Sequence, residues 1–234
     1  MRITEEQIQE AEKLGACSEA LGWLREKSRT WYELAEHNHA WLAWDLTRTQ
    51  FCPSEDLEKL SNHPRWSIRM LVAQHPNTSN DTINHMSNDN DEWVLEVVAK
   101  NPNLLIENIL KLSKHISGYI RFNVANNKKT PSYILDILSK DKYIDVKLGV
   151  IRNKNTSIDT MTSLAKDPND YIRSYVAGYC SEDLFSFLLK DNQFIRRGLA
   201  RNPLVSKDLL NHLLNDDDEI VREIVNGRLK YNDY

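Results

Sequence analysis

The chain has 234 residues, of which 41% are hydrophobic and 27% charged, a composition typical of globular proteins. It carries 34 acidic and 30 basic residues, for a formal net charge of −4, whereas proteins that bind nucleic-acid phosphates usually have an excess of basic residues. Residues 1–8 contain no apolar run, so we expect no signal peptide or membrane span there, and three widely spaced cysteines, Cys17, Cys52 and Cys180, predict reduced thiols of a cytoplasmic protein.

The first 50 residues are predicted to be helical and rich in tryptophan. Thr4 and Gln7 have the spacing of a capping box for a helix that ends near Leu14, and Ser18 can cap a second helix through Leu24. The segment also holds four of the six tryptophans of the chain, namely Trp23, Trp31, Trp41 and Trp44.

From residue 51 onward the sequence repeats. The pattern of residues 169–179, NDYIRSYVAGY, occurs in seven copies, and the residue that corresponds to Arg173 is the reference position of each copy. The reference positions are Arg69, Leu95, Arg121, Lys147, Arg173, Arg196 and Arg222. They are 26 residues apart at every step except the fifth, which is 23. A fixed period of about 20 to 50 residues predicts a solenoid of stacked supersecondary units.

Each copy contains a buried helical stripe. The residue before the reference position and the residue three after it are aliphatic in every copy, and the fourth after it is usually alanine. These offsets lie on one face of an α-helix. The first two members of the stripe are Ile68/Val72, Val94/Val98, Ile120/Val124, Val146/Val150, Ile172/Val176, Ile195/Leu199 and Val221/Val225.

The sequence also predicts where these longer helices begin and end. Six residues before the reference position, most copies have an acid that can act as an N-cap, and Asp167-Pro168 places proline at the first helical position. The acids are Asp89, Asp141, Asp167 and Asp216, with Asp191 one place late in the sixth copy. Asparagines stand where a left-handed residue would end the helix, at Asn101, Asn127, Asn153 and Asn202. Proline follows two of them, but Lys128 and Lys154 follow the other two.

A shorter helix is predicted before each longer one. Two apolar residues with i, i+3 spacing recur upstream, and only about two turns fit, so this element should be a short α or 3₁₀ helix. The pairs are Leu57/Leu60, Ile83/Met86, Ile109/Leu112, Leu135/Leu138, Met161/Leu164, Leu184/Phe187 and Leu210/Leu213. Three residues are missing before Glu182, which predicts a tightened turn.

Several copies share a longer phrase, as in Val98-Ala99-Lys100-Asn101-Pro102, Ile172-Arg173 with Val176-Ala177, and Leu199-Ala200-Arg201-Asn202-Pro203. On these residues the chain from about 54 to 234 resembles the leucine-rich repeat variant family. The resemblance implies a right-handed, all-α superhelix without the β-strand of ordinary leucine-rich repeats. It also implies an interaction scaffold, and it supplies no catalytic residues.

We therefore expect two domains, a helical Trp-rich cap over 1–50 and a repeat solenoid over 51–234. Residues 40–46 fall in repeat register, which indicates a degenerate first unit whose aromatic side chains seal the end of the stack. The alternative is a separate partner-binding module. This segment is similar to a Trp-rich module of uncharacterised bacterial and phage proteins, and the similarity implies a bacterial or phage-type protein.

One polar feature recurs at the reference position. It is basic in six copies, and these residues form the basic column: Arg69, Arg121, Lys147, Arg173, Arg196 and Arg222. One interpretation is structural, with each base pairing to an acid or a turn carbonyl of the neighbouring unit. The other is a stripe that binds nucleic-acid phosphates, which the net charge of the chain disfavours.

Aromatic residues recur near the start of the longer helices. We call them the aromatic positions: Trp66, Trp93, Tyr119, Tyr143, Tyr171 and Phe194. They flank the buried stripe, so they either pack against the next short helix or form exposed anchors for a protein partner.

The sequence carries little sign of chemistry. It contains no nucleotide-binding glycine motif, no nucleophile elbow, no H-E-x-x-H motif and no His and Cys set with zinc spacing. We expect no catalytic residue, cofactor or metal, and a non-enzymatic scaffold that binds a protein, such as a regulator or inhibitor that docks on a bacterial complex. The alternatives are a nucleic-acid-binding repeat protein and an enzyme with an acid in the groove of the solenoid.

Overall fold

The computed structural model describes residues 2–26, 29–38, 40–43 and 51–231. The chain forms two compact units, Met1–Leu112 and Ser113–Tyr234. Within the described ranges the regular structure is helical, apart from an isolated bridge between Arg2 and Thr30. No helix among these residues has the length and apolarity needed to cross a membrane.

The first unit opens with three helices, α1 (Glu5–Lys13), α2 (Ser18–Glu26) and α3 (Trp31–His37). Thr4 and Gln7 form the predicted capping box of α1. Residues 40–43 are helical, whereas the rest of the predicted degenerate unit, including Trp44, lies outside the described residues. The repeats of this unit are built from α5 (Ser54–Leu60), α6 (Trp66–Gln74), α7 (Asn80–Met86), α8 (Glu92–Lys100) and α9 (Ile106–Leu112).

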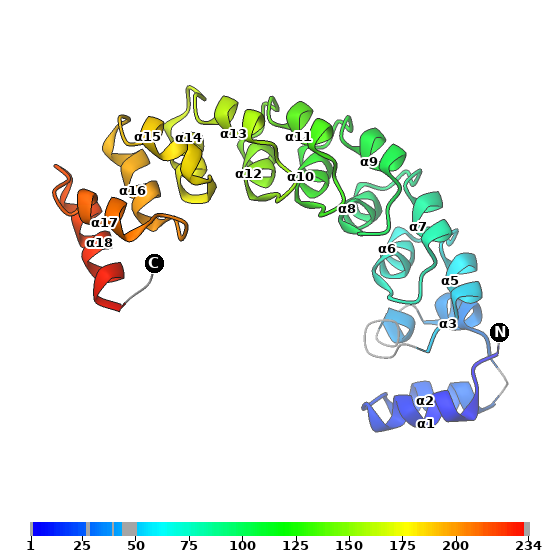
Figure 1. Cartoon of the computed structure of the whole chain (residues 1–234). Coiled ribbons are helices and arrows are strands. Elements are labelled where there is room, and N and C mark those ends of the chain that lie inside the picture. Colours follow the sequence, from blue (N-terminus) through cyan, green and yellow to red (C-terminus); the bar gives the residue numbers. More distant parts are fainter. Residues whose placement is uncertain (1, 27–28, 39, 44–50, 232–234) are drawn as a thin grey trace. The chain divides into compact units, whose positions relative to one another are not determined.

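The second unit continues the alternation of longer and shorter helices. Its elements are α10 (Gly118–Asn126), α11 (Ser132–Leu138), α12 (Ile144–Arg152), α13 (Ile158–Leu164), α14 (Asp170–Tyr179), the 3₁₀ helix η1 (Glu182–Leu184), α15 (Phe185–Leu188), α16 (Gln193–Arg201), α17 (Lys207–Leu213) and α18 (Glu219–Tyr231). The longer helices α10, α12, α14, α16 and α18 pack on one another in sequence. They form one layer, and the shorter helices form a second (Figure 1).

The predicted stripe is the core of both units. Every aliphatic residue one before and three after the reference positions is fully or almost fully buried. Four after it, five alanines and Ile151 are also buried, while Asn226 on the last helix is exposed. Burial of aliphatic side chains between neighbouring copies therefore holds the stack together, because one copy alone cannot cover its own stripe.

The sixth short helix differs from its predicted pattern. Leu184 is buried as expected, but Phe187 is exposed, and Phe185 and Leu188 take the buried places. The three missing residues are accommodated by η1, which tightens the turn before the four-residue α15. The change of helix type rotates the apolar face, so the i, i+3 pair predicted here is wrong.

The longer helices begin two residues later than predicted. Their N-caps lie four residues before the reference position, as Asp91, Tyr143 and Asn169 show. The predicted capping acids, Asp89, Asp141, Asp167, Asp191 and Asp216, form an acid column that lies in the turn before each longer helix. One carboxylate oxygen of each accepts a hydrogen bond from the N–H of the cap residue. Asp141 Oδ1, for example, accepts from Tyr143 N at 2.9 Å. Pro168 precedes α14 rather than opening it. This turn leaves the second carboxylate oxygen available to the basic column.

The helix-ending asparagines are not left-handed, contrary to the prediction. Asn101, Asn127, Asn153 and Asn202 have φ between −76° and −68° with ψ between 122° and 125°. Two of their side chains bond the preceding repeat instead. Asn153 Nδ2 donates to Ala125 O at 2.7 Å and Asn127 O at 2.9 Å, and Asn202 Nδ2 bonds two carbonyls of the preceding repeat in the same way. An extended backbone aims the amide at the neighbouring repeat.

Candidate functional site

The aromatic positions lie at the N-terminal ends of the longer helices and are open to solvent. Their exposed fractions range from 43% for Trp66 to 71% for Tyr119. In the first unit, the ring centroids of Trp66 and Trp93 are 6.4 Å apart. A buried aromatic residue would stabilise the fold, whereas these leave much of their apolar surface in water.

In the second unit, four of these residues stand at the N-terminal ends of successive longer helices, and we call them the aromatic edge: Tyr119, Tyr143, Tyr171 and Phe194. Their helices pack in sequence. The Tyr143 ring lies against Gly118, so close that a Cβ added there would stand 3.1 Å from it. Between α14 and α16, Ser174 Oγ donates to Phe194 O at 3.0 Å.

The aromatic edge is wider than the sequence indicated. Ile116, Ile144 and Ile220 are also exposed, with Ile116 the most exposed large apolar residue among the described positions. Ile220 occupies the same place on α18 as Phe194 on α16. The sequence pattern did not identify these isoleucines as exposed, because an isoleucine beside a buried stripe is usually part of the core.

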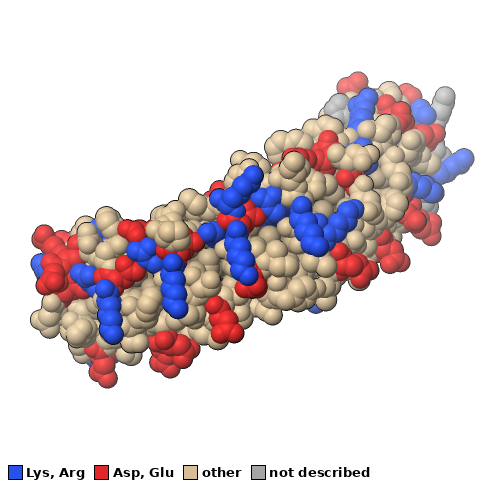
Figure 2. Space-filling model, turned by 90° about the horizontal axis from the view of Figure 1, so that it is seen from above, with Lys and Arg blue, Asp and Glu red and all other residues tan. Residues whose placement is uncertain are grey.

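The basic column forms ion pairs from one repeat to the next. The pairs are Arg69–Asp89 in the first unit and Arg121–Asp141, Lys147–Asp167, Arg173–Asp191 and Arg196–Asp216 in the second. Basic and acidic side chains adjoin one another along much of the face seen in Figure 2. We call these five pairs the ladder. Each pair connects two consecutive copies.

The Arg121 pair shows the geometry. Its guanidinium donates to both oxygens of Asp141, at 2.5 and 3.1 Å, and to the carbonyls of His115 and Ile116, at 2.6 and 2.9 Å. The Arg121 and Asp141 side chains are only 11% and 8% exposed. Arg222 likewise donates to two turn carbonyls, those of Asp216 and Asp217.

The ladder lowers the pKa of Asp89, Asp141, Asp191 and Asp216. Burial raises the pKa of Asp141, but the hydrogen bonds from Arg121 and from the N–H of Tyr143, with the positive charge of Arg121, outweigh burial and leave that pKa below its usual value. The pKa values of Asp89 and Asp216 are lowered by the same balance. At neutral pH Arg69, Arg121 and Arg196 are thus paired with ionised carboxylates.

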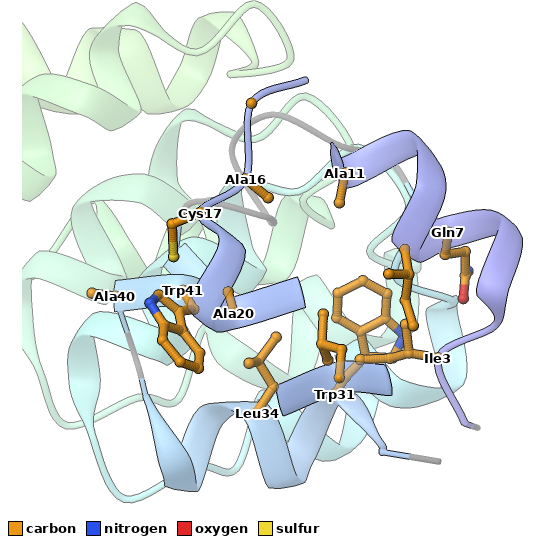
Figure 3. A pocket seen from close by; sticks show the side chains of 13 residues that line it. Ile3, Gln7, Ala11, Ala16, Cys17, Ala20, Trp31, Leu34, Ala40 and Trp41 are labelled. Carbon is orange, nitrogen blue, oxygen red and sulfur yellow. The ribbon is translucent and has the colours of Figure 1, made fainter. Parts of the chain in front are cut away.

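A separate feature is an apolar cavity of about 240 Å³ in the N-terminal helices, which the sequence did not predict. Small residues such as Ala11 and Ala20 leave the space, and Leu34 and Trp31 close it from α3 (Figure 3). Trp31 Nε1 is buried there without a hydrogen-bond partner. Cys17 also lines the cavity and is a free thiol.

Among the described residues, no three His, Cys, Asp or Glu side chains are placed to hold a metal ion. Cys180 is buried, and burial raises the pKa of its thiol to about 12, which keeps it protonated and unreactive.

Comparison with known proteins supports the fold. No family model and no curated protein matches the chain. Among solved structures, the chain is similar to a leucine-rich repeat variant with a novel repetitive structural motif, at a TM-score of 0.60 and 22% identity over 78% of this chain and 74% of that chain. The predicted all-α, leucine-rich-repeat-variant type of solenoid is confirmed, and at this identity the likeness concerns the fold alone.

Proposed function

We propose that this protein is a non-enzymatic scaffold that binds another protein through its aromatic positions. The observation that carries the proposal is the exposure of six aromatic side chains near the N-terminal ends of the longer helices in six successive repeats. Large rigid rings lose little conformational entropy on binding, and they are enriched among the residues that dominate protein–protein affinity. A regulator that docks on a larger complex would use such a surface.

The packing of the second unit favours a repetitive contact. Neighbouring packed helices lie about 8–10 Å apart, so the rings of the aromatic edge recur at about that interval. A partner segment with apolar residues at a matching interval can place one of them beside each ring. The apolar neighbours Ile116, Ile144 and Ile220 enlarge the surface that such a segment covers.

The ladder argues against phosphate binding through the basic column. Arg121 and Arg196 each use two donors on a carboxylate of the next copy, and further donors on turn carbonyls. A phosphate would have to displace these nearly buried carboxylates, which would leave them without a counter-charge. We therefore favour a protein ligand for this side of the repeats.

The test is affinity purification of the tagged protein from its native host at about physiological salt, with and without nuclease. Trp93→Ala with Tyr119→Ala should abolish recovery of the partner while the melting temperature changes little, because both rings are mostly exposed. The matched control is Tyr133→Ala with Phe187→Ala, which removes two comparably exposed rings from the shorter helices.

Loss of the partner in the first double variant but not in the control supports the aromatic positions as the contact. A large drop in melting temperature in the first variant would mean that the rings serve packing. Recovery of nucleic acid alone, lost when Arg173 and Arg196 are reversed in charge, would overturn the proposal in favour of the basic column.

A further inference from the structure

The net charge of the chain conceals an asymmetry between its two units. Residues 1–112 contain 18 acidic and 11 basic residues, whereas residues 113–234 contain 16 acidic and 19 basic residues. The second unit is therefore positive overall although the whole chain is negative. An uneven distribution of this kind is a known feature of proteins that bind polyanions with one part of the chain.

Part of this positive charge lies at the C-terminal ends of α10, α12 and α16 and in the turns that follow them. Five basic side chains lie there, and we call them the basic edge: Lys128, Lys129, Arg152, Lys154 and Arg201. All five are exposed. Residues 126–130, 152–156, 178–181 and 201–205, which form these helix ends and the turns after them, contain no acidic residue.

Hydrogen bonds show that these turns adjoin one another. Asn155 Nδ2 donates to Lys128 O at 2.9 Å and Thr130 O at 3.0 Å, which joins the turn after α12 to the turn after α10. Arg152 lies over the ring of Tyr175, with its guanidinium carbon 4.9 Å from the ring centroid, and so connects α12 to α14. Asn202 Nδ2 bonds Ala177 O and Cys180 O, which connects α16 to α14. These contacts join the helix ends that carry the basic edge, through the end of α14, which contributes tyrosines but no basic residue.

Helix electrostatics account for only part of the basic edge. Arg152 and Arg201 are the last residues of their helices, where the partial negative charge of the helix end favours a cation. Lys128, Lys129 and Lys154 lie beyond the helix ends, and no ion pair to a carboxylate is formed by them within the described part of the chain. Their charges are available to a ligand, unlike those of the ladder.

Aromatic rings lie among these charges. Tyr175 and Tyr179 are stacked on α14, with centroids 5.1 Å apart and an interplanar angle of 20°. Tyr179 is 52% exposed at the C-terminal end of the helix, beside the acid-free turn. Exposed rings next to a row of cations provide a stacking platform for nucleobases, which sequence-tolerant single-strand binders use.

We propose that the basic edge of the second unit binds single-stranded nucleic acid, with the backbone phosphates on the lysines and arginines and a base stacked on Tyr179. An acidic protein segment would match the charges but would make no use of the stacked tyrosines. The aromatic edge lies at the opposite ends of the same helices, so this activity is separate from the proposed protein binding and does not depend on it.

The test is fluorescence anisotropy of a labelled 20-nucleotide thymidine strand with the full-length protein. If the five basic side chains each neutralise a phosphate, the slope of log K against log salt is about −3.5, or about a hundredfold loss of affinity between 50 and 200 mM salt. Lys128→Gln, Lys129→Gln and Lys154→Gln together should reduce that slope by about 2. Tyr179→Ala should weaken binding at least about fivefold with the slope unchanged.

The matched control replaces three exposed lysines of the same unit that lie outside the basic edge, as Lys140→Gln, Lys166→Gln and Lys190→Gln. It changes the net charge equally and should keep the affinity and the slope close to those of the unmodified protein. An equal loss in both triple variants, an unchanged affinity in Tyr179→Ala, competition by polyglutamate as strong as by the unlabelled strand, or no binding at 50 mM salt up to about 100 μM would each overturn the assignment.

Discussion

Replacing Arg121 by methionine is expected to destabilise the second unit strongly. Methionine keeps an unbranched apolar stem but removes every donor. The nearly buried Asp141 carboxylate then loses two hydrogen bonds and its counter-charge, and the carbonyls of His115 and Ile116 each lose a donor. Removing one partner of a buried ion pair costs about 3–5 kcal/mol. Since this pair is slightly exposed, we expect the lower part of that range, about 3 kcal/mol.

A second substitution separates charge from packing. Asp141→Asn in the Arg121→Met background removes the unpaired negative charge, and the amide oxygen of the new side chain can still accept from Tyr143 N, as the Asp141 carboxylate does now. We expect the double variant to regain about 1–2 kcal/mol relative to Arg121→Met alone. Lys142→Ala, which removes an exposed cation one residue from Asp141, should change stability by less than about 0.5 kcal/mol.

Urea unfolding followed by circular dichroism measures these free energies. The same ladder offers an internal comparison, because Lys147 holds Asp167 through a single bond of 2.6 Å, so Arg121→Lys should fall between the unmodified protein and Arg121→Met. If Arg121→Met costs no more than Lys142→Ala, or if adding Asp141→Asn destabilises it further, the carboxylate is not held by Arg121 and the reasoning fails.

Three further changes test other features of the structure. Asp89, Asp141 and Asp216 have native pKa values below the usual value near 3.9, so their contribution to stability is complete above about pH 5 and is lost as the pH falls through the lowered pKa values. The urea concentration at the unfolding midpoint should therefore be nearly constant from pH 7 to 5 and fall below about pH 4. A midpoint that rises steadily toward acid pH would contradict this. Gly198→Ala would place a Cβ 2.4 Å from Ser174 O and 3.0 Å from the Ala177 Cβ, so the melting temperature should fall by an amount equivalent to about 1–3 kcal/mol, whereas Gly178→Ala, with its nearest neighbour at 3.9 Å, should be neutral or stabilising. Ala20→Leu should partly fill the N-terminal cavity and stabilise the protein by about 0.5–2 kcal/mol, and a lower melting temperature would show that the cavity walls cannot admit the larger side chain.

The repeat period and the core could be predicted because both depend on spacing alone. The repeat position that Val124 occupies is aliphatic in every copy, because the neighbouring copies cover this side chain on both sides. The short sixth copy escaped prediction at Phe187 because a deletion changes helix type, and helix type decides which residue faces inward. Periodicity cannot supply that information.

The observed N-caps of the longer helices differ from the predicted ones for another reason. An aspartate before a helix can cap the helix itself or the turn that leads into it, and the two differ by two residues in sequence. In this chain Asp141 caps the turn, because its other oxygen must reach Arg121. The copy that lacks a base, at Leu95, is followed by the copy that has histidine in place of the acid, at His115. That correspondence was the available signal that the two columns belong together.

Exposure was the property least accessible from the pattern. Tyr119 flanks the buried stripe, and either packing or solvent was compatible with its place. The basic edge had a clearer signal. Lys128 and Lys154 stand where other copies have proline after the helix-ending asparagine. Replacing proline by lysine at this turn adds a positive charge to the surface.

The direction of the ladder has a consequence for how the chain is made. Each of the five paired bases finds its aspartate 18 to 20 residues later in the sequence. A copy with such a base therefore leaves the ribosome before the carboxylate that pairs with it has been synthesised. The asparagine amides point the other way, from Asn153 back to Ala125 and from Asn202 back to Ala177. Each new copy therefore completes its predecessor while remaining incomplete itself, and a nascent chain should gain order one copy at a time from its N-terminal end.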